Sequence, residues 1–173
     1  ILFLAPIMKA RDLQVVPREL TEAETRTLAL YESEENGIDE AFSRISTWLA
    51  NGAQAESGVE TFYHQVSPGE EDNAVATMIF NSWIRHTFQT LFHDEEIDFI
   101  WRADGDRIRM RAFHAILTGS GPNNPNNLAS WNPETEESAF FDIQSTDYVE
   151  THNEILLEAL IKTLQLLRSP SME

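Results

Sequence analysis

One uninterrupted stretch, Asp72 to Phe92, constrains the fold of this chain more than any other feature. Asp72 is a good helix N-cap, and the twenty residues after it include neither Pro nor Gly. Apolar residues recur along it at helical spacing in two rows, which together form a wide apolar face. These rows are Val75, Ile79 and Trp83, with Met78 beside them, and Ala76, Phe80, Ile84, Phe88, Leu91 and Phe92. A face this wide predicts a central helix that other helices cover on more than one side.

An amphipathic patch and one helix are predicted before residue 38. The segment Ile7 to Val16 is a short amphipathic patch that Pro17 ends. Thr21 and Glu24 have the spacing of a capping box, so a helix is expected to open there. An acidic run and then Asn36-Gly37 follow, and the glycine is expected to close that helix as a left-handed C-cap.

The segment Ile38 to Leu49 carries the cleanest amphipathic pattern in the chain, and Asn51-Gly52 are expected to end it. Its predicted inward face consists of Ile38, Phe42, Ile45 and Leu49, with Ala41 and Trp48 flanking. Val59 to Val66 is rich in strand-forming residues, which favours a short strand or an extended link. Ser67 to Glu71 is predicted to be a turn that leads into the central helix.

Helices are also expected after the central stretch. His93 to Trp101 and Arg107 to Leu117 are predicted to be short helices, and residues 118–137 form a long loop with three Pro and five Asn. Thr151 and Glu154 form a second capping box that opens a last helix. The apolar stripe of that helix is Ile155, Leu156, Leu160, Ile161, Leu164 and Leu167. The pattern predicts a mainly α fold with minor β, and one mostly helical segment over residues 1–173.

Composition excludes several classes of partner. The formal charge is −17, from 29 acidic against 12 basic residues, so the surface repels nucleic acids and anionic membranes. This charge is expected to be a solvated acidic surface or a face that meets a basic partner. The chain has no cysteine, which removes disulfides, thiol catalysis and cysteine zinc sites. The apolar start, Ile1 to Met8, predicts an element interrupted partway and hence a piece of something larger.

Motifs that carry chemistry are absent from the sequence. The five histidines, His64, His86, His93, His114 and His152, never occur at the i, i+4 spacing of helical metal ligands, and no metal site is predicted. Ser120 lies between two glycines, but the frame of a nucleophile elbow is missing. No catalytic residue is therefore assigned. Trp131, in the long loop, is the candidate for substrate binding, although such a loop can equally wrap a neighbouring segment.

The packing residues resemble one known family. The run Asp72 to Trp83 resembles the helix in the large β subunit of penicillin acylases that carries an acid, small residues, an aromatic residue and then Trp. Ile38 to Leu49, with Trp48 near its end, looks like the helix ahead of that element. Ala5 to Met8 is similar to a short Pro-containing link, and Thr151 to Leu167 fits a later long helix. The resemblance covers most of the chain, in order, and rests on packing residues.

That family consists of N-terminal nucleophile hydrolases, which cleave side-chain amides such as those of penicillins and acyl-homoserine lactones. Their nucleophile is the serine that begins the β subunit, with its own α-amine as base. Position 1 is Ile1 here, and the family's oxyanion-hole asparagine and substrate-site arginine precede the matching segment, so no catalytic residue carries over. The resemblance implies an internal β-subunit segment of a larger α+β hydrolase whose αββα core lies elsewhere.

The resemblance also implies the surroundings of the chain. Its partners would be the other chains or segments of the same processed α/β heterodimer, and its substrate a small-molecule amide. The enzyme would be periplasmic or secreted, with no cofactor in this chain, and the chain alone would be inactive. The alternative is an independent acidic, mostly helical protein-interaction module. A free-standing enzyme of another type is the third reading.

Overall fold

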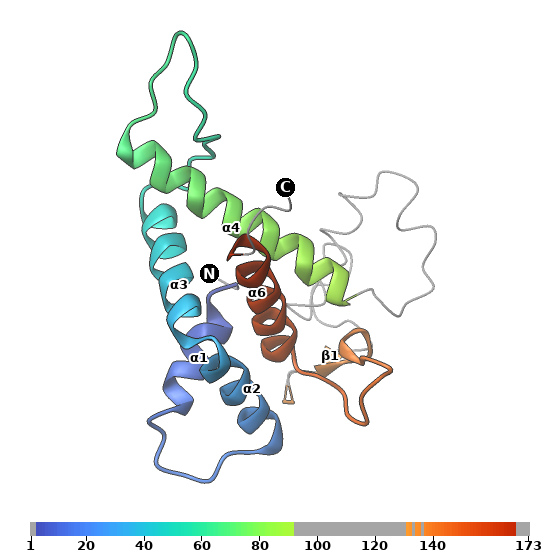
Figure 1. Ribbon diagram of the computed structural model, residues 1–173. Helices are drawn as coiled ribbons and strands as arrows, with labels where there is room; N and C mark the ends of the chain where they lie inside the picture. Colours follow the sequence, from blue (N-terminus) through green and yellow to red (C-terminus); the bar gives the residue numbers. More distant parts are fainter. Residues whose placement is uncertain (1–2, 92–130, 133, 136, 169–173) are drawn as a thin grey trace.

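The computed structural model describes residues 3–91, 131–132, 134–135 and 137–168, and helices dominate them (Figure 1). The helices are α1 (Ala5–Leu13), α2 (Glu22–Ser33), α3 (Glu35–Ala50), α4 (Pro68–Leu91) and α6 (His152–Arg168). Two-residue strands β1 (Trp131–Asn132) and β2 (Glu137–Ser138) pair antiparallel, and a 3-10 turn, η1 (Ala139–Phe141), follows. The prediction of a mainly α fold with minor β is therefore confirmed.

Helix α4 is the longest described helix and is covered on two sides, as the sequence predicts. It packs most extensively on α6 and next on α3 (Figure 1). Trp83 is fully buried, whereas Met78, predicted to lie beside the same row, is half exposed. Phe3 packs edge-on against Trp83 with ring centroids 5.1 Å apart, which places the start of the chain beside the middle of α4. The buried residues of α4 are Ala76, Ile79, Trp83, Thr87, Thr90 and Leu91.

The predicted start of α4 is wrong. Residues 68–71 belong to the helix, so Asp72 lies inside it and no separate turn precedes it. The Ser67 backbone N–H donates to the Glu70 carboxylate at 2.8 Å, and Pro68 occupies the first helical position, where no N–H is needed. Ser67-Pro68-Gly69-Glu70 therefore has the capping-box spacing, which the turn-like Pro-Gly pair obscures in the sequence.

The boundary between α2 and α3 also differs from the prediction. The break falls at Glu34, and Gly37 lies within α3 with no positive φ, so it is no left-handed C-cap. A Cβ on Gly37 would stand 2.2 Å from Nη2 of Arg168 and 2.7 Å from Oε1 of Glu34. Arg168 and Glu34 form an ion pair across this glycine. The glycine is therefore used for close approach between α3 and the end of α6.

Helix α3 is confirmed, but its inward face is rotated from the predicted one. Ile38, Ala41, Ile45 and Trp48 are buried, whereas Leu49 is 37% exposed. The flanking residues Ala41 and Trp48 thus replace Leu49 because α4 covers the side of the helix on which Trp48 lies. Gly52 has φ +89° just past the end of the helix, as expected of a C-terminal glycine.

Helix α1 is part of the core and carries a polar link to α2 and α3. Leu4 and Ile7 are buried within this chain, whereas Met8 is 53% exposed. Asp39 Oδ1 accepts hydrogen bonds from the guanidinium of Arg11, at 2.7 and 3.0 Å, and from the Tyr31 hydroxyl at 2.7 Å. Burial raises the pKa of Asp39, but these hydrogen bonds outweigh it, so the pKa is lowered and the residue stays ionised.

Helix α6 closes the core, since it contacts α1, α2, α3 and α4. Its predicted capping box is confirmed by the Thr151 backbone N–H, which donates to Glu154 at 2.8 Å. The predicted stripe is inward, with Leu157 and Ala159 added and with Ile161 and Leu167 only partly buried. The fully enclosed apolar residues are Ile155, Leu156, Leu157, Ala159 and Leu160.

The remaining segments are irregular or lie outside the described residues. Val59 to Val66 forms an extended link with one isolated bridge, between Thr61 and His64. The helices predicted at residues 93–101 and 107–117, and residues 118–130 of the long loop, lie outside the described residues. Along the described residues, none of the helices combines the length and the apolar character that crossing a membrane requires.

Candidate functional site

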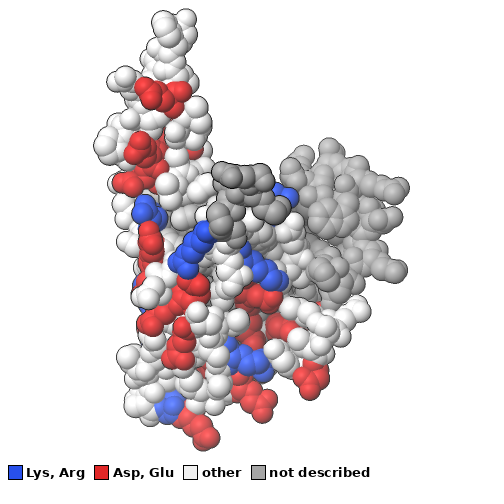
Figure 2. Space-filling view, viewed as in Figure 1, with Lys and Arg blue, Asp and Glu red and all other residues white. Residues whose placement is uncertain are grey.

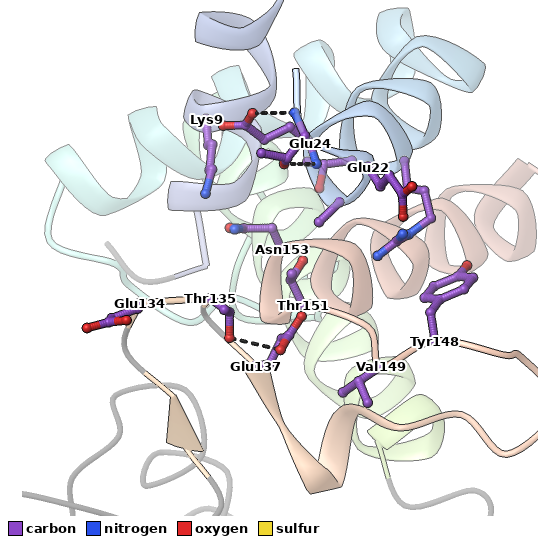
Figure 3. A pocket seen from close by; sticks show the side chains of 14 residues that line it. Lys9, Glu22, Glu24, Glu134, Thr135, Glu137, Tyr148, Val149, Thr151 and Asn153 are labelled. Carbon is purple, nitrogen blue, oxygen red and sulfur yellow. Dashed lines mark hydrogen bonds between the residues drawn. The ribbon is translucent and has the colours of Figure 1, made fainter. Parts of the chain in front are cut away.

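A half-open cleft of about 630 Å³ lies between α2, the β1–β2 turn and the start of α6 (Figure 3). The bridge between Glu137 and Thr151 attaches β2 to the start of α6, so the turn forms one wall. Lys9 of α1 reaches the opposite side. Most of the lining residues have polar or charged side chains; the full set is Lys9, Thr21, Glu22, Ala23, Glu24, Arg26, Thr27, Glu134, Thr135, Glu137, Tyr148, Val149, Thr151 and Asn153.

One ion pair fixes the position of Arg26, which lines the cleft. Nε of Arg26 lies 2.5 Å from Oε1 of Glu154, whose side chain is 4% exposed. The guanidinium also stacks on the ring of Tyr148, 3.8 Å from its centroid. Burial and then the nearby Glu150 raise the pKa of the Tyr148 hydroxyl, so this group stays protonated at neutral pH. The positively charged side chain of Arg26 is thus held in the cleft by Glu154 and by the ring of Tyr148.

The rim of the cleft on α2 is the N-terminal cap of that helix, in which hydrogen bonds hold the Glu24 carboxylate. Glu24 accepts two short hydrogen bonds from Arg18, at 2.6 and 2.7 Å, and one from the Thr21 backbone N–H at 3.0 Å. The Arg18 bonds and then the Thr21 bond lower the pKa of Glu24 to about 2. A carboxylate with this pKa stays ionised near neutral pH and cannot serve as a general acid there.

The lining favours binding over catalysis. The described lining residues include no histidine, and the Thr151 hydroxyl already donates to Glu154 at 2.8 Å. Thr21 accepts from the Glu24 backbone N–H in its helix cap. The remaining carboxylates, Glu22, Glu134 and Glu137, give the opening an acidic character. Such a cleft suits a polar or cationic group better than an anion.

The predicted histidines are dispersed in the structure. His64 lies 2.7 Å from Glu70, and His86 Nδ1 lies 2.8 Å from the Thr163 hydroxyl. Burial, and then the charges of Arg85 and Lys162, lower the pKa of His86. His152 packs beside Phe141 at the start of α6, while residues 93 and 114 lie outside the described residues. Within the described ranges no group of three His, Asp or Glu side chains is placed to hold a metal ion.

Of the two loop residues singled out in the sequence, Trp131 lies within the described residues and Ser120 does not. The backbone of Trp131 lies in β1, paired with Ser138, and the turn that follows it supplies Glu134 and Thr135 to the cleft. The end of the predicted 118–137 loop therefore borders the cleft, while substrate binding by Trp131 stays a prediction. Ser120 lies outside the described residues.

Sequence reasoning missed the cleft itself. Arg26 and Glu154 are 128 residues apart, so no local spacing signals their contact. The sequence does contain two capping boxes, Thr21 with Glu24 and Thr151 with Glu154. They predict where two helices start, but not that these two starts lie side by side.

Comparisons with protein-family models, with curated proteins and with solved structures found no match for this chain. The resemblance to penicillin acylases therefore stays a prediction from the residue pattern.

Proposed function

We propose that this chain is a non-catalytic helical segment of an amide hydrolase of the penicillin acylase type. In the assembled protein, the enzyme releases an acyl group from a side-chain amide, with the nucleophile on another chain or segment. This segment supports the catalytic core by packing and borders it with the acidic cleft. Export to the periplasm or the exterior, an α/β heterodimer and a larger α+β fold belong to the same proposal.

The observation that carries the proposal is the ordered resemblance along the chain. Its four parts, the Pro-containing link, the amphipathic helix, the central helix and the late helix, correspond to the start of α1 and to α3, α4 and α6. These helices share one core with Trp83 in its interior, so the residues that carry the resemblance are packing residues. A pattern of this kind supports a role in scaffolding better than one in chemistry.

The decisive experiment uses the assembled protein from its native source. Mass analysis of the denatured sample is expected to show a second chain that begins with Ser, Thr or Cys. A sulfonyl fluoride should label the first residue of that chain and leave this 19.7 kDa chain unlabelled. Release of nitroaniline from aromatic or fatty-acyl nitroanilides should stop on labelling. Label on this chain, or a sample that holds this chain alone, contradicts the proposal.

A second function, an independent protein-interaction module, is favoured by one specific observation. The apolar faces of α1, α2, α3, α4 and α6 cover one another, so the described residues already form a core of their own. A module of this kind should be a monomer with a single cooperative melt when Ile1–Glu173 is produced alone. Under the hydrolase proposal the isolated chain should aggregate or melt broadly, because apolar side chains that are exposed here, such as Met8 and Leu166, would contact other segments of the enzyme.

A further inference from the structure

The connection between α3 and α4, residues 51–67, projects beyond the helices (Figure 1). At Phe62 and Tyr63 it exposes two aromatic side chains almost completely, with 94% and 93% of their surfaces accessible. The two rings meet edge-on with centroids 5.0 Å apart. We refer to this pair as the aromatic tip. Adjacent large apolar groups on a projection mark interaction sites more often than isolated exposed residues do.

Local bonds hold the aromatic tip in place. The Thr61 N–H donates to the His64 carbonyl at 2.8 Å, and the His64 N–H donates back to the Thr61 carbonyl at 3.2 Å. Nε2 of His64 lies 2.7 Å from Oε1 of Glu70, in the first turn of α4. The two rings are thus presented by a closed two-residue turn that is tied to a long helix. Binding through a preordered turn costs less conformational entropy than binding through a loose loop.

The negative charges around the aromatic tip indicate which class of partner it can bind. No Lys or Arg occurs between Arg44 and Arg85, whereas acids precede the tip and follow it. Figure 2 shows acidic side chains along this projection. A nucleic acid or an anionic membrane would be repelled, and a second copy of the chain would bring the same negative charges. The acids between Arg44 and Arg85 are Glu56, Glu60, Glu70, Glu71 and Asp72.

We propose that the aromatic tip docks into an apolar pocket of a protein partner whose rim carries Lys and Arg side chains. The two rings fill the pocket, since buried aromatic residues dominate interface energies. Glu56 and Glu60 face the basic rim and raise the association rate. This inference does not depend on the hydrolase proposal, because the tip, its turn and its charges belong to this chain under either function.

The test uses the full chain and a fluorescent amphipathic peptide of Leu and Lys, which presents an apolar face with basic edges. Fluorescence anisotropy should detect binding to the unchanged chain. The double variant Phe62→Ala/Tyr63→Ala should bind about tenfold or more weakly, the loss expected when anchoring aromatics are truncated. Val15→Ala, which trims a 79% exposed residue on another surface, should bind as tightly as the unchanged chain.

Two further comparisons separate the tip from general charge attraction. A Lys peptide without Leu, and a Leu/Glu peptide, should each bind at least about tenfold more weakly than the Leu/Lys peptide. Glu56→Gln/Glu60→Gln should keep the rings but reduce the salt dependence of binding. Because Glu60, Phe62 and Tyr63 are exposed, Glu56 is only partly buried, and all four lie outside the helices, circular dichroism should show unchanged helix content.

Several outcomes would overturn the proposal. They are no binding of the Leu/Lys peptide, equal binding by the Phe62→Ala/Tyr63→Ala variant, and equal binding of the Lys peptide without Leu. Sedimentation that shows a dimer which this variant abolishes would assign the tip to a second copy of the chain and would equally overturn it.

Discussion

Trp83 of α4 donates its indole N–H to the backbone carbonyl of Leu156 in α6, at 2.8 Å. Both residues are fully buried, so the bond joins the two helices that form the most extensive packing contact in the described structure. Leu156 lies in the first turns of α6. Its carbonyl accepts this hydrogen bond from Trp83, a residue of another helix. One side chain thus supplies both apolar contact and a specific polar link.

Replacing Trp83 with Ala is expected to lower the free energy of unfolding by about 3–5 kcal/mol, the range for emptying a large aromatic site. Trp83→Phe should cost less, because the ring remains and the chief losses are the N–H bond and part of the ring volume. Urea unfolding followed by circular dichroism measures both. An alanine variant that melts within a degree or two of the parent would contradict the central place of α4.

Glu154 both pairs with Arg26 and caps helix α6, and substitutions can separate these two roles. In Glu154→Gln the amide oxygen can still accept from Thr151, while its NH₂ group would face Arg26. We expect a loss of about 2–4 kcal/mol, below the fully buried case because Arg26 is 27% exposed. Glu154→Ala also removes the cap and should cost about 0.5–2 kcal/mol more. In the Arg26→Met background the effect of Glu154→Gln should shrink; an unchanged effect would show that the pair is not coupled.

Gly37 gives a prediction in which two effects nearly cancel. An alanine at a helical position gains up to about 1 kcal/mol over glycine. At position 37, however, the new Cβ must push Arg168 away from Glu34, which forfeits an exposed pair worth about 0–1 kcal/mol. Gly37→Ala should therefore be close to neutral in the unchanged chain and stabilising in the Arg168→Ala background. An equal gain in both backgrounds, measured by thermal unfolding, would exclude the steric contact.

The lowered pKa of Glu24 predicts how the α2 cap responds to acid. Because the folded pKa is about 2 and the ordinary value is 4.5, the unfolded chain binds this proton more readily. The cap's contribution to stability is thus fully present above pH 4.5 and lost as pH falls toward 2. The difference in melting temperature between the parent and Glu24→Gln should be largest at pH 7 and vanish near pH 2. Adding Arg18→Met to Glu24→Gln should cause no comparable further loss.

The hydrolase proposal predicts which changes spare the chemistry. In the assembled enzyme, Ser120→Ala and single replacements of the five histidines should leave kcat nearly intact. Loss of a nucleophile or base would lower kcat by several orders of magnitude. Trp131→Ala is expected to raise KM for an aromatic or fatty-acyl anilide while kcat holds. A correctly assembled but inactive Ser120→Ala enzyme would place the nucleophile in this chain and reject the proposal.

Local features of the fold were predictable, and contacts between distant segments were not. The capping boxes at Thr21 and Thr151 and the central helix follow from spacing within one helix. The helical role of Gly37 depends on Arg168, which approaches from another helix, so local preference pointed to the wrong conformation. The cleft depends on Arg26 meeting Glu154, and no pattern along the chain encodes that distance.

Helix α6 comes after all the other described helices in the sequence, yet it contacts every one of them. During synthesis, α1 to α4 therefore leave the ribosome before the element that covers their apolar faces exists. Contacts between segments this far apart form slowly, and uncovered apolar surface favours aggregation in the interval. A chain truncated before His152 is thus expected to depend on chaperones from the moment it is made, because it lacks the helix that completes its interior.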